Sequence, residues 1–212
     1  MTVEKTHTHI ENSIVRKKGG ELIFPTDYRG RGTEAAIKKA LSRLAQKGTV
    51  KRLTHGIYYV PKIDPILGEL RPGADEVVKM LARKEKIRVR PAGAYALHRL
   101  GLTNQVPTKL VYITDGHARQ FKLGKLQIKF KATTSKKLST TGKISGLVIQ
   151  ALEELGTKNV DSNIEAKILG LLINEDSKKL KHDLALASAK VNDYIVNLLK
   201  KMGNDRMDKP NR

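Results

Sequence analysis

The stretch that begins at Thr33 constrains the fold more than any other part of the sequence. Thr33 is a good N-cap residue, and apolar residues recur at helical spacing over 34–47 until Gly48, a residue type that commonly ends helices. Two short runs typical of strands follow, 49–53 and 57–60, with a tight turn between them. The sequence therefore predicts one regular helix followed directly by a hairpin.

The residues before this helix predict two further helical segments. A first helix ends at two adjacent glycines, and a short apolar step at 22–24 follows it. Thr26 and Asp27 are N-cap types for a short second helix around Tyr28, and a Gly-Arg-Gly turn then leads into the third helix. Helix, helix, tight turn, helix and hairpin is the order of a winged helix-turn-helix, so we expect residues 1–62 to form such a DNA-binding domain.

The third helix has two distinct faces, as a helix in the DNA major groove requires. At about 100° per residue, Ile37, Ala40, Leu41 and Leu44 gather on one side and are expected to pack on the first two helices. The opposite side is small near its start and polar or basic further on, so it can offer donors to base edges and phosphates. The turn before the helix and the hairpin after it, the predicted wing, add further basic side chains. The residues we expect to contact DNA are Arg29, Arg31, Thr33, Lys38, Lys39, Ser42, Arg43, Gln46, Lys51, Arg52 and His55.

The charge of the chain also favours a nucleic-acid partner. Its 41 Lys and Arg residues exceed its 21 Asp and Glu residues, which gives a formal net charge of +20. Such a field attracts polyanions, and neutralising phosphates releases their counterions. Residues 1–62 hold 13 basic and 5 acidic residues, whereas 63–212 hold 28 and 16, so the excess per residue is greater in the first part.

Composition and hydropathy exclude several other classes of protein. The chain has no cysteine, which excludes disulfides, thiolate metal sites and cysteine nucleophiles. No apolar run approaches the ~20 residues of a transmembrane helix, and the N-terminus lacks the apolar stretch of a signal peptide. We therefore expect a cytoplasmic protein with no membrane partner.

The rest of the chain predicts a second domain of mixed composition. Pro and Gly dipeptides over 62–73 are typical of a linker or an irregular crossing. Helical and strand patterns mix beyond it, and the last predicted helix runs from Leu184 to Met202. We expect an α+β protein with an N-terminal winged helix-turn-helix, a mixed α/β second domain with C-terminal helices over 63–202, and a flexible tail over 203–212.

Several stretches resemble one known family. Residues 36–44, followed by 47–52 and 55–58, are similar to the helix and hairpin in the N-terminal domain of AbiEi-type antitoxins and related bacterial proteins. Residues 94–102, with the Val-Pro step at 106–107, resemble the opening of that family's second domain.

The resemblance implies a transcriptional repressor that binds the double-stranded DNA of its own promoter. It also implies that the second domain counteracts a nucleotidyltransferase-type toxin encoded beside it, as the antitoxin of a toxin-antitoxin system that forms no stable complex with the toxin. The positions to which it carries DNA contacts are Arg31, Thr33, Lys38, Lys39, Ser42, Arg43, Lys51 and Arg52.

Two other classes of function stay open on the sequence. An RNA-binding or ribosome-associated protein would also be basic and poor in aromatic residues, which make up 4% of this chain. An enzyme acting on nucleic acid would need a converging acidic cluster, and Asp115 and Asp161 are the residues whose loss would test it. The His and carboxylate spacings fit no metal site, and no Gly-rich loop fits a phosphate cradle. We therefore expect no catalytic or metal-binding residue, no cofactor and no enzymatic activity, while the oligomeric state stays open.

Overall fold

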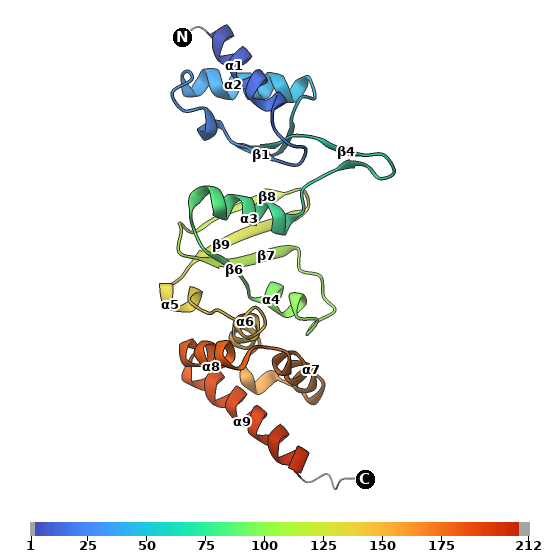
Figure 1. Ribbon diagram of the computed structural model, residues 1–212, viewed down its shortest axis with the longest axis vertical. Helices are drawn as coiled ribbons and strands as arrows, with labels where there is room; N and C mark the ends of the chain where they lie inside the picture. The colour runs from blue at the N-terminus through green and yellow to red at the C-terminus, as the bar shows by residue number, and fades with distance from the viewer. Residues whose placement is uncertain (1–2, 208–212) are drawn as a thin grey trace. The chain divides into compact units, whose positions relative to one another are not determined.

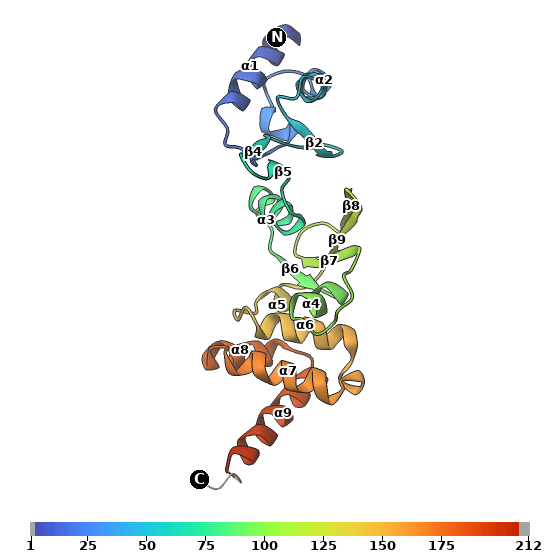
Figure 2. The same ribbon diagram turned by 90° about the vertical axis from the view of Figure 1, so that its right-hand side faces the viewer.

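The computed structural model describes residues 3–207, and the side chains of 5–201. The chain is α+β, as expected, with helices and short sheets along its length (Figures 1 and 2). Its contacts divide it into two compact units. The N-terminal unit is the chain up to Glu85 together with Phe121–Lys125, and the C-terminal unit is Lys86–Gln120 together with the chain from Leu126 onward.

The first part of the N-terminal unit combines helices with a small antiparallel sheet. In chain order its elements are α1 (Val3–Val15), β1 (Leu22–Ile23), the 3-10 helix η1 (Pro25–Tyr28), α2 (Glu34–Gln46), β2 (Lys51–Thr54) and β3 (Ile57–Tyr59). β3 pairs antiparallel with both β1 and β2, so the strand order is β1-β3-β2. The predicted helix and the hairpin after it are confirmed, and Gly48 follows the helix with a φ of +80°.

The predicted apolar face of α2 lies in the core of this unit. Ile37, Ala40, Leu41 and Leu44 are each at most 3% exposed. They cluster with apolar side chains of α1, β1 and β3. Fully burying a side chain such as Leu or Ile contributes about 1.5–3 kcal/mol, so this stripe fixes which face of α2 remains in solvent.

The second helical segment differs from the prediction. It is the single 3-10 turn η1, and its N-cap position is Phe24 rather than Thr26 or Asp27. The Asp27 carboxylate instead accepts a hydrogen bond from the backbone N–H of Phe24 at 2.8 Å and pairs with Lys84. This contact stabilises the start of the turn, and the segment ends after one turn because Arg29 leaves helical geometry, with a ψ of 136°, and Gly30 has a φ of +81°.

The stretch expected to be a linker or an irregular crossing contains a regular hairpin over residues 62–70. Asp64 initiates a tight turn, in which its carboxylate accepts hydrogen bonds from the backbone N–H groups of Ile66 and Leu67, both at 2.9 Å. The N-terminal unit therefore continues beyond the expected boundary at residue 62 (Figure 1). The elements of this part are β4 (Lys62–Asp64), β5 (Gly68–Leu70), which pairs antiparallel with β4, and α3 (Ala74–Glu85).

The C-terminal unit starts with strands and ends with helices. Its sheet has the order β6-β7-β9-β8, in which β7 runs antiparallel to β6 and parallel to β9. The buried residues of the later helices form the unit's main apolar cluster. After Glu85 the elements in chain order are β6 (Val89–Ala92), α4 (Ala94–Arg99), β7 (Lys109–Thr114), β8 (Arg119–Leu123, of which Phe121–Leu123 is counted with the N-terminal unit), β9 (Leu126–Ala132), α5 (Ser135–Leu138), α6 (Ser145–Leu155), η2 (Thr157–Asn159), α7 (Ser162–Ile173), α8 (Ser177–Leu186) and α9 (Ala189–Met207).

The predicted single helix from Leu184 to Met202 is two helices, α8 and α9. Ala187 is extended, with a ψ of 164°, and the backbone carbonyl of Ser188 accepts the first bonds of α9. The carbonyl of Leu184, near the end of α8, accepts from the backbone N–H of Ala187 and, at 2.8 Å, from the side-chain amide of Asn192, which ties the start of α9 to the end of α8. α9 continues to Met207, beyond the expected helix end, and the last five residues of the predicted tail, 208–212, lie outside the described residues.

Candidate nucleic-acid interface

The turn before α2 is held against α1 by a close backbone approach. The Thr6 hydroxyl donates to the carbonyl of Arg31 at 2.9 Å, and Thr6 is 1% exposed. A Cβ added to Gly32 would lie 2.4 Å from this hydroxyl oxygen, so no side chain fits there. Thr33 then caps α2, because its hydroxyl oxygen accepts from the backbone N–H of Ala36 at 3.2 Å. These contacts fix where α2 begins, while the N–H groups before Ala36 stay open to an anion.

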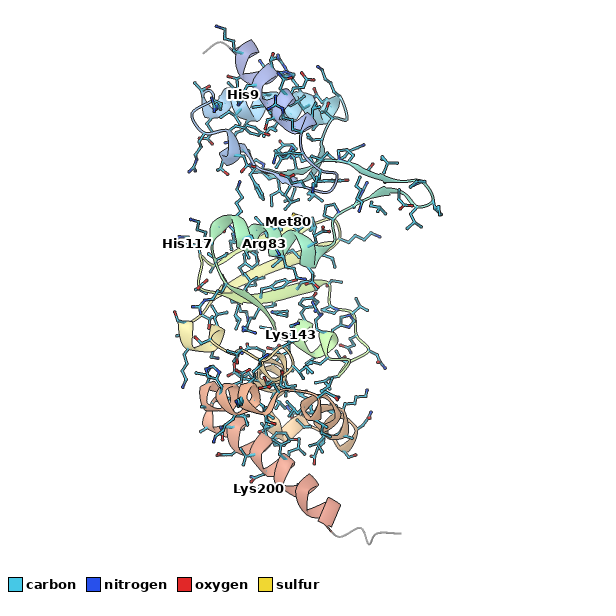
Figure 3. The ribbon with its side chains drawn as sticks, in the orientation of Figure 1. His9, Met80, Arg83, His117, Lys143 and Lys200 are labelled. Atoms are coloured by element: carbon cyan, nitrogen blue, oxygen red, sulfur yellow. The ribbon has the colours of Figure 1, made fainter. Side chains whose placement is uncertain are left out.

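The exposed strip of α2 lies opposite its buried face. Its polar members are Lys39, Ser42, Arg43 and Gln46, and all four are exposed (Figure 3 draws the side chains on the ribbon). Within the described part of the chain, none of the four makes a side-chain hydrogen bond or ion pair. A side chain with no intramolecular partner keeps its donors for solvent or for a ligand.

Lys38, at the border of this strip, is already paired. Its Nζ lies 2.5 Å from Oε1 of Glu34, one turn earlier on the same helix. The hydrogen bond from Lys38 and its charge hold the pKa of the Glu34 carboxyl below its usual value. Lys38 therefore brings less net charge to the interface than Lys39 does.

The hairpin β2–β3 carries the predicted wing residues. Nη2 of Arg52 lies 3.0 Å from Nδ1 of His55, and the Arg52 guanidinium lies 6.0 Å from the centre of the Tyr58 ring. Both Arg52 and His55 are exposed. The wing tip therefore presents a guanidinium that is oriented by its own hairpin.

Lys51, the third wing residue, faces the hairpin β4–β5. Its Nζ lies 3.8 Å from Oε2 of Glu69. The other oxygen of this carboxylate, Oε1, accepts a hydrogen bond from the Tyr59 hydroxyl. Burial and this bond raise the pKa of Tyr59 to about 12. All eleven predicted side chains are thus exposed on one unit, but Lys38 and Lys51 share their charge with a carboxylate.

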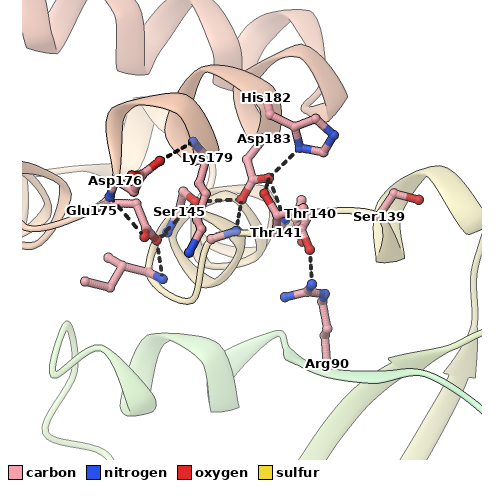
Figure 4. A network of polar contacts seen from close by, with 12 residues as sticks. Arg90, Ser139, Thr140, Thr141, Ser145, Glu175, Asp176, Lys179, His182 and Asp183 are labelled. Atoms are coloured by element: carbon pink, nitrogen blue, oxygen red, sulfur yellow. Dashed lines mark hydrogen bonds and ion pairs between the residues drawn. The ribbon is translucent and has the colours of Figure 1, made fainter.

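A buried polar network in the C-terminal unit was not predicted (Figure 4). Asp183 is 0% exposed, and its carboxylate accepts from the backbone N–H groups of Thr141 and Gly142 at 2.7 and 2.9 Å. The Ser145 hydroxyl donates to it at 2.6 Å, and Nδ1 of His182 lies 3.0 Å away. The buried Asp183 carboxylate therefore has hydrogen-bond partners on both of its oxygens.

A second carboxylate of the network, that of Glu175, closes the N-terminus of α6. It accepts from the backbone N–H groups of Ile144 and Ser145 at 2.7 and 3.0 Å. A Cβ added to Gly142 would lie 2.0 Å from the Ser145 hydroxyl oxygen and 2.6 Å from a Glu175 oxygen, so the loop packs directly on the carboxylate. The Glu175 carboxylate therefore supplies the negative charge that the N-terminus of a helix favours.

Both carboxylates are held ionised. Burial raises the pKa of Asp183 and of Glu175, but the hydrogen bonds that they accept outweigh it and leave both below their usual values. Both carboxylates are ionised, so neither can donate a proton at neutral pH. The hydrogen bonds that they accept hold the 140–145 loop in place. Sequence reasoning missed it because the partners are 30 to 42 residues apart.

The acidic residues considered for an enzyme have structural contacts. Asp115 pairs with Arg88, at 2.8 Å from its Nε, and Asp161 caps α7 by accepting from the N–H of Ile164 at 2.8 Å. Among the described residues, no group of three or more His, Cys, Asp or Glu side chains could hold a metal ion. His9 and His117, labelled in Figure 3, belong to different units.

The chain belongs to a family of unknown function, DUF6088, whose model matches residues 9–180. The match includes all eleven predicted DNA-contact residues and the network carboxylate of Glu175, and it ends three residues before Asp183. A comparison with curated proteins finds no match. Over the part of the chain that the structure describes, no helix has both the length and the apolar character needed to cross a membrane.

Proposed function

We propose that the N-terminal unit is a winged helix-turn-helix that binds double-stranded DNA and represses transcription. The observation that carries the proposal is the exposed strip of α2, whose Lys39, Ser42, Arg43 and Gln46 have no partner within the described residues. The order of elements, with two strands after α2 and a β1-β3-β2 sheet, supports the proposal.

The geometry supports contacts with different parts of the DNA for different side chains. α2 has 13 residues, about 20 Å at 1.5 Å per residue, and its exposed strip can enter a major groove about 12 Å wide. Arg29 and Arg31 precede its N-terminus, where phosphates are favoured. Arg52 and His55 at the wing tip would contact the backbone or the minor groove beside it. A protein bound in this way to its own promoter blocks transcription by occupancy, and it acts in the cytoplasm.

The first experiment compares the DNA upstream of the protein's own gene with a random duplex of equal length, by anisotropy titration at several salt concentrations. We expect salt-dependent binding that is tighter on the upstream DNA. Arg43→Ala and Lys39→Ala should each weaken binding, by about 1–3 kcal/mol where the side chain reads a base. Lys178→Ala, an exposed lysine of α8, is the matched control and should bind as the unchanged protein does. Equal binding to both duplexes would overturn the proposal.

We further propose that the repressor is the antitoxin of a toxin-antitoxin pair. The support is the resemblance of residues 94–102 to the second domain of AbiEi-type antitoxins. That stretch forms α4 and a turn at Gly101, with a φ of +66°. Co-expression with the neighbouring gene tests it. We expect that gene to encode a nucleotidyltransferase-type toxin, which arrests growth when expressed alone but not when this chain is also expressed. Growth arrest that this chain does not relieve would leave a plain repressor.

A further inference from the structure

A long run of the sequence, most of which belongs to the C-terminal unit, contains no acidic residue. Between Asp115 and Glu153 there is no Asp or Glu, although the whole chain has 21. The Lys and Arg residues in the run are Arg119, Lys122, Lys125, Lys129, Lys131, Lys136, Lys137 and Lys143. A segment with one sign of charge creates a local positive field.

The sheet places three lysines of the C-terminal unit on one face. In β9, Ile128 and Phe130 are buried, so Lys129 and Lys131 point to the opposite side, since side chains alternate along a strand. The parallel register with β7 pairs Lys109 with Gln127 and Val111 with Lys129. Paired residues share a face, so Lys109, Lys129 and Lys131 form one surface, named here the lysine face.

The lysine face is free of intramolecular anions. Lys109 and Lys131 are exposed and Lys129 is half-buried, and none of the three has an ion pair within the described residues. Lys137, by contrast, pairs with Glu153 at 2.8 Å. A neighbouring polar contact on this face is neutral: the Gln127 amide donates to Gln120 at 3.2 Å.

The surroundings of the lysine face favour phosphates over bases. Leu138 of α5 covers the same sheet face towards β6, where it clusters with Ala92 and Ile113. The sheet's aromatic rings, Tyr112 and Phe130, are on the other face and contact each other at 6.1 Å. Single-stranded nucleic acid is bound by stacking on exposed aromatic side chains, which this surface lacks. Lysines on alternate residues of a strand, about 6.6 Å apart, suit successive phosphates of a duplex backbone.

We infer that the lysine face binds the phosphate backbone of duplex DNA without reading its sequence. DNA rather than RNA is chosen because it is the ligand proposed for α2, and in this respect the inference rests on the proposed function. The C-terminal unit thereby adds affinity for any duplex, while α2 supplies the preference for one.

The test removes the three charges from the full-length protein by Lys109→Gln, Lys129→Gln and Lys131→Gln. The matched control removes three exposed, unpaired lysines of the unit's helices by Lys158→Gln, Lys178→Gln and Lys190→Gln. Kd for a random-sequence DNA duplex is measured by anisotropy across a salt series. Thermal unfolding confirms that both variants fold.

The lysine-face variant should bind the random duplex at least about 10-fold more weakly near 0.1 M salt. The slope of log Kd against log salt should fall by about 2–3, because each lost phosphate contact removes about 0.9. The helix control should keep the slope within about 0.5 of the unchanged protein. The random duplex needs no sequence preference, so this result stands even if α2 shows none. An equal loss in both variants would overturn the inference in favour of net charge alone. An RNA duplex bound more tightly than DNA through the same lysines would overturn the choice of DNA.

Discussion

The free backbone N–H groups at the start of a helix need hydrogen-bond acceptors, and α2 and α6 meet this need in opposite ways. Each follows a glycine that packs closely on a side chain from elsewhere, Gly32 on Thr6 and Gly142 on Glu175. At α2, the Thr33 hydroxyl is the only side-chain acceptor on its first N–H groups within the described residues; the basic Arg29 and Arg31 precede the helix, and Glu34 in its first turn pairs with Lys38. At α6, the carboxylates of Glu175 and Asp183 occupy the end of the helix and its approach loop. A helix start filled by its own chain's carboxylate serves stability, whereas an open one with basic neighbours is suited to an external phosphate.

The largest effect is expected at the closed helix start. The N–H groups of Thr141 and Gly142 donate to different oxygens of Asp183, so Asp183→Asn leaves one of them facing an amide N–H₂ in place of an acceptor, and it removes hydrogen bonds to a charged group. We expect the free energy of unfolding to fall by about 3 kcal/mol, measured by urea denaturation.

Asp193→Asn is the matched control, because Asp193 is exposed on α9 and has no hydrogen bond or ion pair within the described residues. It should change the free energy of unfolding by less than about 0.5 kcal/mol. Similar losses in the two variants would show that the network at α6 contributes nothing particular.

Acid should weaken the closed helix start more than the open one, where the Glu34 carboxyl, whose pKa is also lowered, is exposed to solvent. The folded pKa of Asp183 is below its ordinary value of 3.8, and that of Glu175 is below 4.5. Depressed carboxyl pKa values contribute stability that is fully present above the ordinary values and is lost as pH falls through them toward the folded values. The free energy of unfolding should therefore drop between about pH 5 and pH 3.

The variants locate the origin of this acid sensitivity. Asp183→Asn should lose less stability over the same pH range than the unchanged protein, because one of the two groups no longer titrates. Asp193→Asn should follow the unchanged protein. A steeper loss in Asp183→Asn than in the unchanged protein would contradict the assignment.

The contrast between the two helix starts also shows what sequence could predict. The faces of α2 follow from its 3.6-residue period, and Thr33 and Gly48 are local signals that hold in the structure. The break between α8 and α9 depends on Asn192 bonding to Leu184, which a continuous helical pattern conceals. The site residues on α2 could be named because burial of the apolar stripe leaves only one other face. The network of Asp183 could not, because its donors belong to a loop that only the fold brings close.

The smallest effect is expected at the open helix start, from Thr33→Ala. The single hydroxyl cap of α2 is worth about 1 kcal/mol in unfolding free energy, a third of the loss expected at α6. Thr33→Ser keeps the hydroxyl and should restore most of this loss, and the pH dependence should be unchanged in both variants because no carboxylate is involved. Urea denaturation at neutral and acid pH measures the free energy of unfolding of both variants and of the unchanged protein. A Thr33→Ala loss as large as that of Asp183→Asn would mean that α2 depends on its cap as α6 does on its carboxylates. The distinction between a helix start completed by its own chain and one left for a phosphate would then fail.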